Sequence, residues 1–177
     1  MTDPAYIRTA LAAQLGAALD TLVYCVEQCP EDQWQESHGD YPFSQVVFHT
    51  LFFCDFYLSG SMSDFKNQAY HTDRPGFFGD YEELENRKPC KLYKRGDIVE
   101  YLGFCKAKAY SFLVASSDGQ LYATAHHKKG TMSVLELVVY LTRHIQHHAA
   151  QLGLRLQLLD GNEMPWFSKG TPPGHGI

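Results

Sequence analysis

Positive charge is scarce in this chain of 177 residues, in which 15 Lys and Arg stand against 20 Asp and Glu, so that the formal net charge is -5 at pH 7. Binding to a nucleic-acid backbone depends on clustered Lys and Arg. The two short basic clusters, at 88–95 and 128–129, each lie beside an expected turn. The chain also lacks a secretory signal at its start and an apolar stretch long enough to span a bilayer. We therefore expect a cytoplasmic protein with no nucleic acid and no membrane among its partners.

Paired cysteine motifs are also missing. The five cysteines are Cys25, Cys29, Cys54, Cys90 and Cys105, and no two of them form a Cys-x-x-Cys motif. Their odd number and wide scatter argue against a disulfide framework and against a zinc ribbon. We expect reduced thiols, with Cys25, Cys29 and Cys54 filling the core.

Strand alternation is absent, and four segments instead show helical periodicity. The first begins after Pro4 and stops before Pro30, and the second begins near Ser44 as its N-cap and ends at Gly60. The third covers 97–115, and the fourth begins with a capping box at 133–136 and ends at Gly161. The pattern predicts an all-α fold, a four-helix bundle over residues 1–160 with a long connection between helices 2 and 3. The C-terminal tail, 161–177, is expected to be poorly ordered at its end.

Two features of the second helix and its following connection carry further expectations. The helix is apolar on almost every face, which predicts a homodimer that buries some of Phe48, Phe52, Phe56 and Tyr57. The connection at 61–95 is rich in Gly, Pro and aromatic residues, and a loop of this length is usually functional or contains a small element of its own. Residues 81–85 could form one helical turn.

The fourth helix carries a cluster of histidines in the sequence RHIQHHAAQ at 143–151. Each residue advances about 100° around a helix, so with His144 at zero His148 lies at about 40° and the apolar stripe near 80°. His147 falls at about −60°, away from the core. His144 and His148 therefore face inward together, and two imidazoles at i and i+4 can bind one metal ion. The Glu of a zinc-protease helix is missing, and so are the Glu-x-x-His pairs of di-iron bundles.

A third ligand must come from another helix, and His49 lies within the apolar body of the second one. A lone core histidine is more often satisfied by a hydrogen bond than by a metal ion. The pair at 144 and 148 changes this balance, because burying three imidazoles without partners is costly and a metal ion removes that cost.

These features resemble the DinB-like superfamily of four-helix-bundle metalloenzymes. The resemblance rests on the inward His of the second helix and on His-x-x-His-His-x-x-Gln in the long last helix, and it covers nearly the whole chain. The family's metal ligands are the helix-two His and the two outer histidines of His-x-x-x-His, which match His49, His144 and His148. Where the family commonly has Arg-Gly-Gln after the last His, this chain has Ala-Ala-Gln, so only Gln151 matches.

The resemblance implies a divalent transition metal, zinc, nickel or iron, all of which suit imidazole ligands. Three His ligands leave a position open, as in catalytic sites, where water or a low-molecular-weight thiol could be activated. Some relatives transfer such thiols to small electrophiles and others are presumed hydrolases. The implied function is thus a hydrolase or thiol S-transferase acting on a small molecule, with no catalytic residue assigned. The alternative is a non-catalytic metal-binding or stress-response protein whose ion is structural or vestigial.

The neighbours of the three histidines supply possible supporting groups. Tyr140 and Gln151 lie at about −40° and −20°, flanking His144, and either could orient a ligand or donate a hydrogen bond to substrate. His147 is a further candidate for such a role or else a surface residue. Asp55, six residues after His49, is expected to be a charged surface residue. The pair His126-His127 is expected in a solvated turn.

Overall fold

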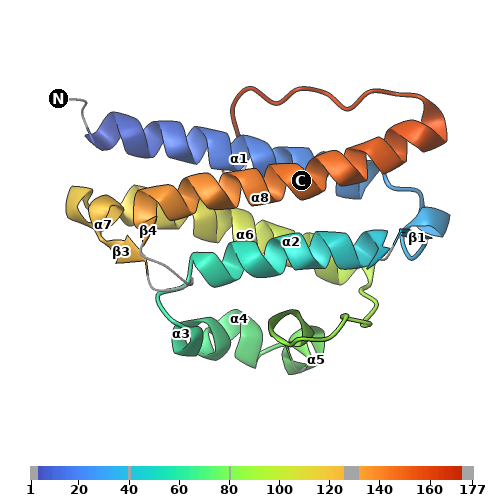
Figure 1. Cartoon of the computed structure of the whole chain (residues 1–177), viewed down its shortest axis with the longest axis horizontal. Helices are drawn as coiled ribbons and strands as arrows, with labels where there is room; N and C mark the ends of the chain where they lie inside the picture. Colours follow the sequence, from blue (N-terminus) through green and yellow to red (C-terminus); the bar gives the residue numbers. More distant parts are fainter. Residues whose placement is uncertain (1–3, 40, 80, 126–131, 173–177) are drawn as a thin grey trace.

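Four long helices form a bundle in which α1 (Pro4–Gln28) and α2 (Phe43–Tyr57) each pack against both α6 (Arg95–Ala115) and α8 (Val134–Asp160) (Figure 1). The computed structural model describes residues 4–39, 41–79, 81–125 and 132–172. The all-α bundle with a long connection between its second and third helices is therefore confirmed. The histidine pair expected at 126–127 lies outside the described residues.

The helix ends follow local chemistry, with one correction. At the start of α8, Ser133 Oγ accepts a hydrogen bond from the Glu136 backbone N–H at 3.2 Å and the Ser133 N–H donates to the Glu136 carboxylate at 2.7 Å, which is the predicted capping box. The helix ends at Gly161, whose φ of 77° suits a glycine. Ser44 is not the N-cap of α2. It is buried in the first turn, where its hydroxyl donates to Gln35 Oε1 at 2.7 Å.

Short elements fill the connections. Before α2 lie η1 (Glu31–Gln33) and the strands β1 (Ser37–His38) and β2 (Tyr41–Pro42), which pair antiparallel with Ser37 opposite Pro42. Between α2 and α6 lie α3 (Met62–Asn67), α4 (Ala69–Thr72), α5 (Pro75–Phe78) and η2 (Glu82–Leu84), the last within the single turn predicted at 81–85. Between α6 and α8 lie α7 (Asp118–Tyr122), β3 (Thr124–Ala125) and β4 (Met132–Ser133), with Thr124 opposite Ser133.

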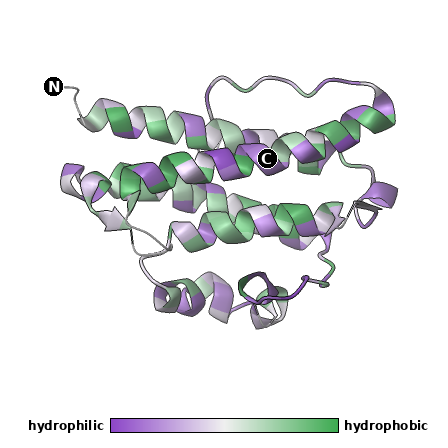
Figure 2. Ribbon diagram, in the orientation of Figure 1, coloured by the Kyte–Doolittle hydropathy of each residue, from purple (hydrophilic) through white to green (hydrophobic). Residues whose placement is uncertain are grey.

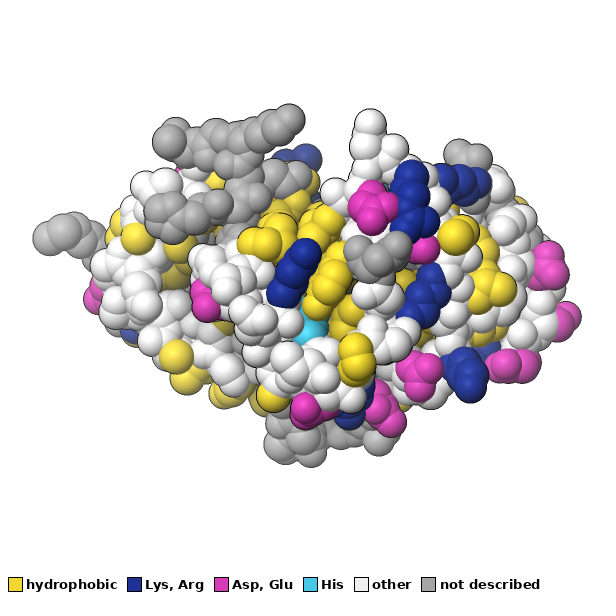
Figure 3. Space-filling model, turned by 90° about the horizontal axis from the view of Figure 1, so that it is seen from below, with side chains coloured by type: hydrophobic (Ala, Val, Ile, Leu, Met, Phe, Trp, Pro, Cys, Tyr) yellow, Lys and Arg dark blue, Asp and Glu magenta, His cyan; other side chains and the backbone are white. Residues whose placement is uncertain are grey.

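The connection α3–α5 covers the side of α2 that faces away from the bundle (Figure 1). Hydrophobic residues run along most of α2 (Figure 2), and nearly all of them are buried. The Phe65 ring of α3 lies 5.0 Å from that of Phe52, and the Phe77 ring of α5 lies 5.4 Å from that of Phe48. A single chain already buries Phe48, Phe52, Phe56 and Tyr57, so a second copy is not needed to cover these side chains, and the homodimer stays a prediction. Seen from below, the molecule presents charged side chains around a strip of hydrophobic ones (Figure 3).

Helix α1 corrects the expectation about membrane-spanning stretches. By length and composition alone, residues 5–28 are apolar enough to cross a bilayer. Half of the apolar window is buried inside the protein, and the helix packs along α6 and α8. Its apolar character is that of a core helix, and Leu15, Leu19 and Leu22 are each 1% exposed or less.

The cysteines match their predicted state. All five are free thiols, and four of them are buried, while Cys90 is exposed. Burial raises the pKa of Cys25 to about 12, so this thiol stays protonated at neutral pH. Its Sγ lies 3.5 Å from the Ala149 carbonyl and 3.7 Å from Met164 Sδ, in the interior between α1, α8 and the tail.

Candidate metal centre

Three imidazoles meet where α2 packs against α8. His49 lies in the middle of α2, and His144 and His148 lie one turn apart on α8. Each offers a ligand nitrogen, and these atoms all lie within 4.8 Å of one another. The ring centroids are 5.4 Å apart for His49 and His144 and 4.7 Å apart for His144 and His148. His147 is exposed on the outer side of α8, as its helical angle predicts, although its ring touches that of His148.

A buried carboxylate fixes the His49 ring. Glu83 Oε2 lies 2.6 Å from His49 Nδ1, and Glu83 Oε1 accepts a hydrogen bond from Gln45 Nε2 at 2.5 Å. The Glu83 side chain is only 4% exposed. Because the carboxylate holds the imidazole proton on Nδ1, the Nε2 lone pair of His49 is left for a cation. A carboxylate behind a ligating histidine is a common feature of metal sites.

Gln151 gives His148 the same orientation. His148 Nδ1 lies 2.9 Å from Gln151 Oε1, an oxygen that accepts the Nδ1 proton and leaves the Nε2 lone pair for a cation. Burial lowers the pKa of His148 to about 4, helped by the nearby His49 and His147 and opposed by the Gln151 hydrogen bond. His148 is therefore neutral at pH 7, which is the form that binds metal ions.

Tyr140 lies on α8 one turn before His144. Its half-buried ring packs edge-on against Tyr57, with 5.7 Å between centroids. Gln151, the other residue predicted to flank His144, contacts His148 through the hydrogen bond to its Nδ1.

A pocket of about 470 Å³ opens beside His49 and His148. Its walls come from β2, α2, the segment 82–89 and α8. They consist of Tyr41, Gln45, Val46, His49, Glu82, Glu83, Glu85, Arg87, Pro89, His148, Gln151 and Arg155. The pocket is the size of a small-molecule site, and acidic and basic side chains line it together with two of the histidines.

Glu83 and Gln45 are the site residues that sequence reasoning missed. Gln45 could have been found from α2, because it lies one turn before His49 and so on the same face. Glu83 had a weaker signal, since it lies in the single turn predicted at 81–85 within a connection predicted to be functional. Nothing in the aperiodic segment 61–95 indicates which of its three glutamates in that turn faces His49.

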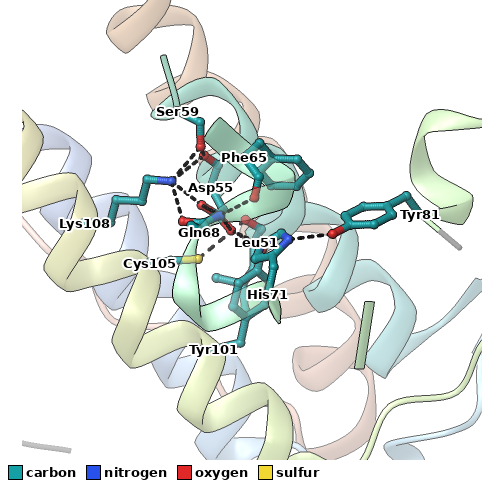
Figure 4. A network of polar contacts seen from close by, with 10 residues as sticks. All are labelled: Leu51, Asp55, Ser59, Phe65, Gln68, His71, Tyr81, Tyr101, Cys105 and Lys108. Atoms are coloured by element: carbon teal, nitrogen blue, oxygen red, sulfur yellow. Dashed lines mark hydrogen bonds and ion pairs between the residues drawn. The ribbon is translucent and has the colours of Figure 1, made fainter. Parts of the chain in front are cut away.

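Asp55 is wrongly predicted as a surface residue. It faces away from His49, as expected, yet it is fully buried between α2, α4 and α6. Its carboxylate accepts hydrogen bonds from His71 Nε2 at 2.8 Å, Tyr101 Oη at 2.9 Å and Lys108 Nζ at 2.5 Å (Figure 4). Burial by itself raises the pKa of Asp55, but the contacts with His71 and Lys108 outweigh it and lower the pKa below the ordinary value of 3.8. Asp55 is thus the ionised centre of a second polar cluster.

A profile of the DinB superfamily matches residues 14–152, which is more than three quarters of the chain and includes all three histidines. The chain belongs to the DinB superfamily. The fold is similar to the crystal structure of a DinB-like protein (YjoA) from Bacillus subtilis, with a TM-score of 0.60 and 12% sequence identity over 92% of this chain and 99% of that one. No curated protein matches this chain significantly in sequence.

Within this DinB superfamily chain, the donor set fits a divalent transition metal ion. Neutral imidazole nitrogens suit such ions, and the hydrogen bonds to Glu83 and Gln151 hold two of the rings in the tautomer that ligation requires. The tail after α8 lies beyond the part of the chain that the DinB profile matches, and so does the start of α1.

Proposed function

We propose that this DinB superfamily protein is a metal-dependent enzyme that holds one divalent transition metal ion, zinc, nickel or iron, through His49, His144 and His148. The observation that carries the proposal is the convergence of three imidazoles, two of which have their Nδ1 atoms engaged by Glu83 and Gln151. A hydrogen bond at Nδ1 fixes the tautomer that a ring needs to ligate through Nε2. A ring that only fills space could use a hydrogen bond at either nitrogen.

The chemistry divides between the ion and the chain. A divalent ion held by the three histidines would supply a Lewis acid with an open position, where water or a thiol would be activated at neutral pH. Glu83 keeps His49 in place and holds the proton of its ring on Nδ1, because its carboxylate is 2.6 Å away and shielded from solvent. The pocket beside His49 and His148 would hold a small molecule next to the position where the ion is bound.

Two reactions fit this arrangement, hydrolysis of a small molecule and transfer of a low-molecular-weight thiol to a small electrophile. Both suit a cytoplasmic protein, and the free state of the five cysteines supports a reducing compartment. The alternative is a non-catalytic protein whose ion is structural. The pocket favours the enzyme, because a structural ion needs no adjoining space of about 470 Å³.

The proposal can be tested with the protein loaded with Co²⁺, whose visible spectrum reports on its ligands. Adding small thiols should change the spectrum by occupying the open position, and the zinc-, nickel- or iron-loaded protein should turn over an ester or thiol-plus-electrophile panel. His144→Ala should abolish both signals, whereas the outward-facing His147→Ala should keep them. A bound ion whose spectrum no thiol changes, together with no turnover, would establish the structural alternative instead.

A further inference from the structure

Tyr81 has an unusual backbone for a residue with a side chain. It is the one non-glycine residue with a positive φ, 60°, among the parts of the chain that the structure describes. This left-handed conformation is unfavourable for tyrosine, so the surroundings must hold it. Tyr81 directly precedes η2, the turn that carries Glu83 to His49. The backbone of Tyr81 therefore sets the direction in which the chain enters η2.

The Asp55 cluster is what holds Tyr81. The Tyr81 hydroxyl lies 3.1 Å from His71 Nδ1, and the other nitrogen of that ring, Nε2, lies 2.8 Å from the Asp55 carboxylate (Figure 4). Because the carboxylate accepts the Nε2 proton, the other ring nitrogen, Nδ1, is left to form a hydrogen bond with the Tyr81 hydroxyl. His71 is buried, and its ring stacks on Phe78 with 3.5 Å between centroids.

The turn is tied down again just beyond Tyr81. The Glu82 carboxylate accepts hydrogen bonds from the backbone N–H groups of Cys90 at 2.8 Å and Lys91 at 3.2 Å. These bonds fix η2 against the segment that leads into α6. The residue directly after these two attachments is Glu83, whose side chain reaches inward to His49 and Gln45. The two polar clusters of the protein are therefore connected through residues 81–83.

We propose that Tyr81 is a positioning residue of the metal centre, held by the Asp55–His71 pair so that the left-handed turn it forms places Glu83 against His49 Nδ1. The proposal rests on the proposed metal site for its effect on affinity, but the hydrogen bond that it explains exists without metal. Because Tyr81 acts only through Glu83, the effect of Tyr81→Phe on metal affinity should disappear in a variant that already lacks the Glu83 carboxylate.

Tyr81→Phe removes the hydroxyl and little else. In metal-free protein with ¹⁵N-labelled histidine, long-range ¹H–¹⁵N spectra should show the His49 proton on Nδ1 in the wild type and a mixture of tautomers in Tyr81→Phe. Competition with a chelator should show that Zn²⁺ affinity falls about tenfold, the lower end of what loss of a supporting contact behind a metal ligand costs. Tyr70→Phe is the matched control. Tyr70 lies in α4, within the same connection between α2 and α6, and its hydroxyl makes no hydrogen bond among the described residues.

A double variant separates positioning from general stability. With Glu83→Ala already present, adding Tyr81→Phe should leave the Zn²⁺ affinity unchanged, because the group that Tyr81 positions is gone. The inference is overturned if Tyr81→Phe keeps the wild-type tautomer, or if it weakens Zn²⁺ binding equally with and without Glu83. If the wild type binds no Zn²⁺, the proposed function fails, and the tautomer spectra alone decide on Tyr81.

Discussion

At the scale of single residues, regular helix geometry explains which parts of the site could be predicted. The angle between positions on α8 places His144 and His148 inward and His147 outward, and the structure has them so. Glu83 could not be placed in this way, because it comes from a segment whose path depends on the backbone of Tyr81. The burial of Asp55 does not follow from its helical angle, because its partners lie on α4 and α6 and the angle does not show which neighbours a residue faces.

The lowered pKa of His148 predicts a specific pH dependence for the metal-free protein. An unfolded His148 has a pKa near 6.5 and binds a proton as the pH falls, whereas the folded residue, with a pKa of about 4, stays neutral. Because the unfolded state then binds more protons, stability should fall as the pH goes from about 6.5 to about 4. Urea unfolding at several pH values with a chelator present measures this loss.

The variant His148→Gln should show a shallower loss of stability over the same pH range. His147→Gln, which changes the exposed neighbour, should keep the wild-type pH dependence. Equal pH dependence in the wild type and His148→Gln would show that burial does not suppress protonation of this ring.

At the scale of elements, the packing of the connection α3–α5 on α2 is the feature that sequence periodicity does not predict. The sequence indicates that the apolar surface of α2 is too large for one bundle core and predicts that a second copy of the chain covers it. The chain instead covers α2 with aromatic residues of α3 and α5, which have no periodicity long enough to reveal them in advance. A homodimer stays a prediction, but it must use a surface other than this face of α2.

The Asp55 cluster attaches the connection α3–α5, which covers α2, to the rest of the bundle. Asp55→Asn should therefore weaken the attachment of this connection. Asparagine removes the negative charge that pairs with Lys108, and it offers one acceptor oxygen where the carboxylate offers two to His71, Tyr101 and Lys108. Breaking a buried ion pair in this way costs about 3–5 kcal/mol of unfolding free energy. Because the pKa of Asp55 lies below 3.8, its contribution is present above that pH and is lost as the pH falls through the folded value.

Urea unfolding at pH 7 checks the effect of Asp55→Asn. Asp73→Asn, an exposed change at the end of α4, should cost less than about 0.5 kcal/mol. If Asp55→Asn lowers the free energy of unfolding as little as the control does, the Asp55 cluster contributes little to holding the connection α3–α5 on the bundle.

At the scale of the whole molecule, the tail after α8 returns along α1 (Figure 1). The Gly170 N–H donates to the Ala13 carbonyl at 2.9 Å, and Thr171 donates to the Asp20 carboxylate from its backbone N–H at 2.7 Å. The tail was predicted as a separate segment with a poorly ordered end, and 173–177 lies outside the described residues. Its docking could not be predicted because it depends on backbone contact and not on an apolar pattern.

Gly170→Ala should undock this part of the tail. A methyl group at residue 170 would lie 2.3 Å from the Gly16 carbonyl carbon, a backbone atom that cannot rotate away. Such overpacking costs about 1–3 kcal/mol, and thermal unfolding should show a lowered midpoint together with faster proteolytic cleavage after residue 161. Gly119→Ala, which meets nothing within 4 Å, should not lower the midpoint. An unchanged midpoint and cleavage rate for Gly170→Ala would show that the close approach is not required.

The central claim is that three particular histidines hold the metal ion, and metal content measures it most directly. Protein purified without an affinity tag should contain about one divalent transition metal ion per chain by elemental analysis. His49→Ala, His144→Ala and His148→Ala should each lose most of it, because each removes one of three converging ligands. His147→Ala should keep it, because that ring lies on the exposed side of α8. Loss of metal in His147→Ala with retention in His148→Ala, or no change in any of the four, would contradict the account.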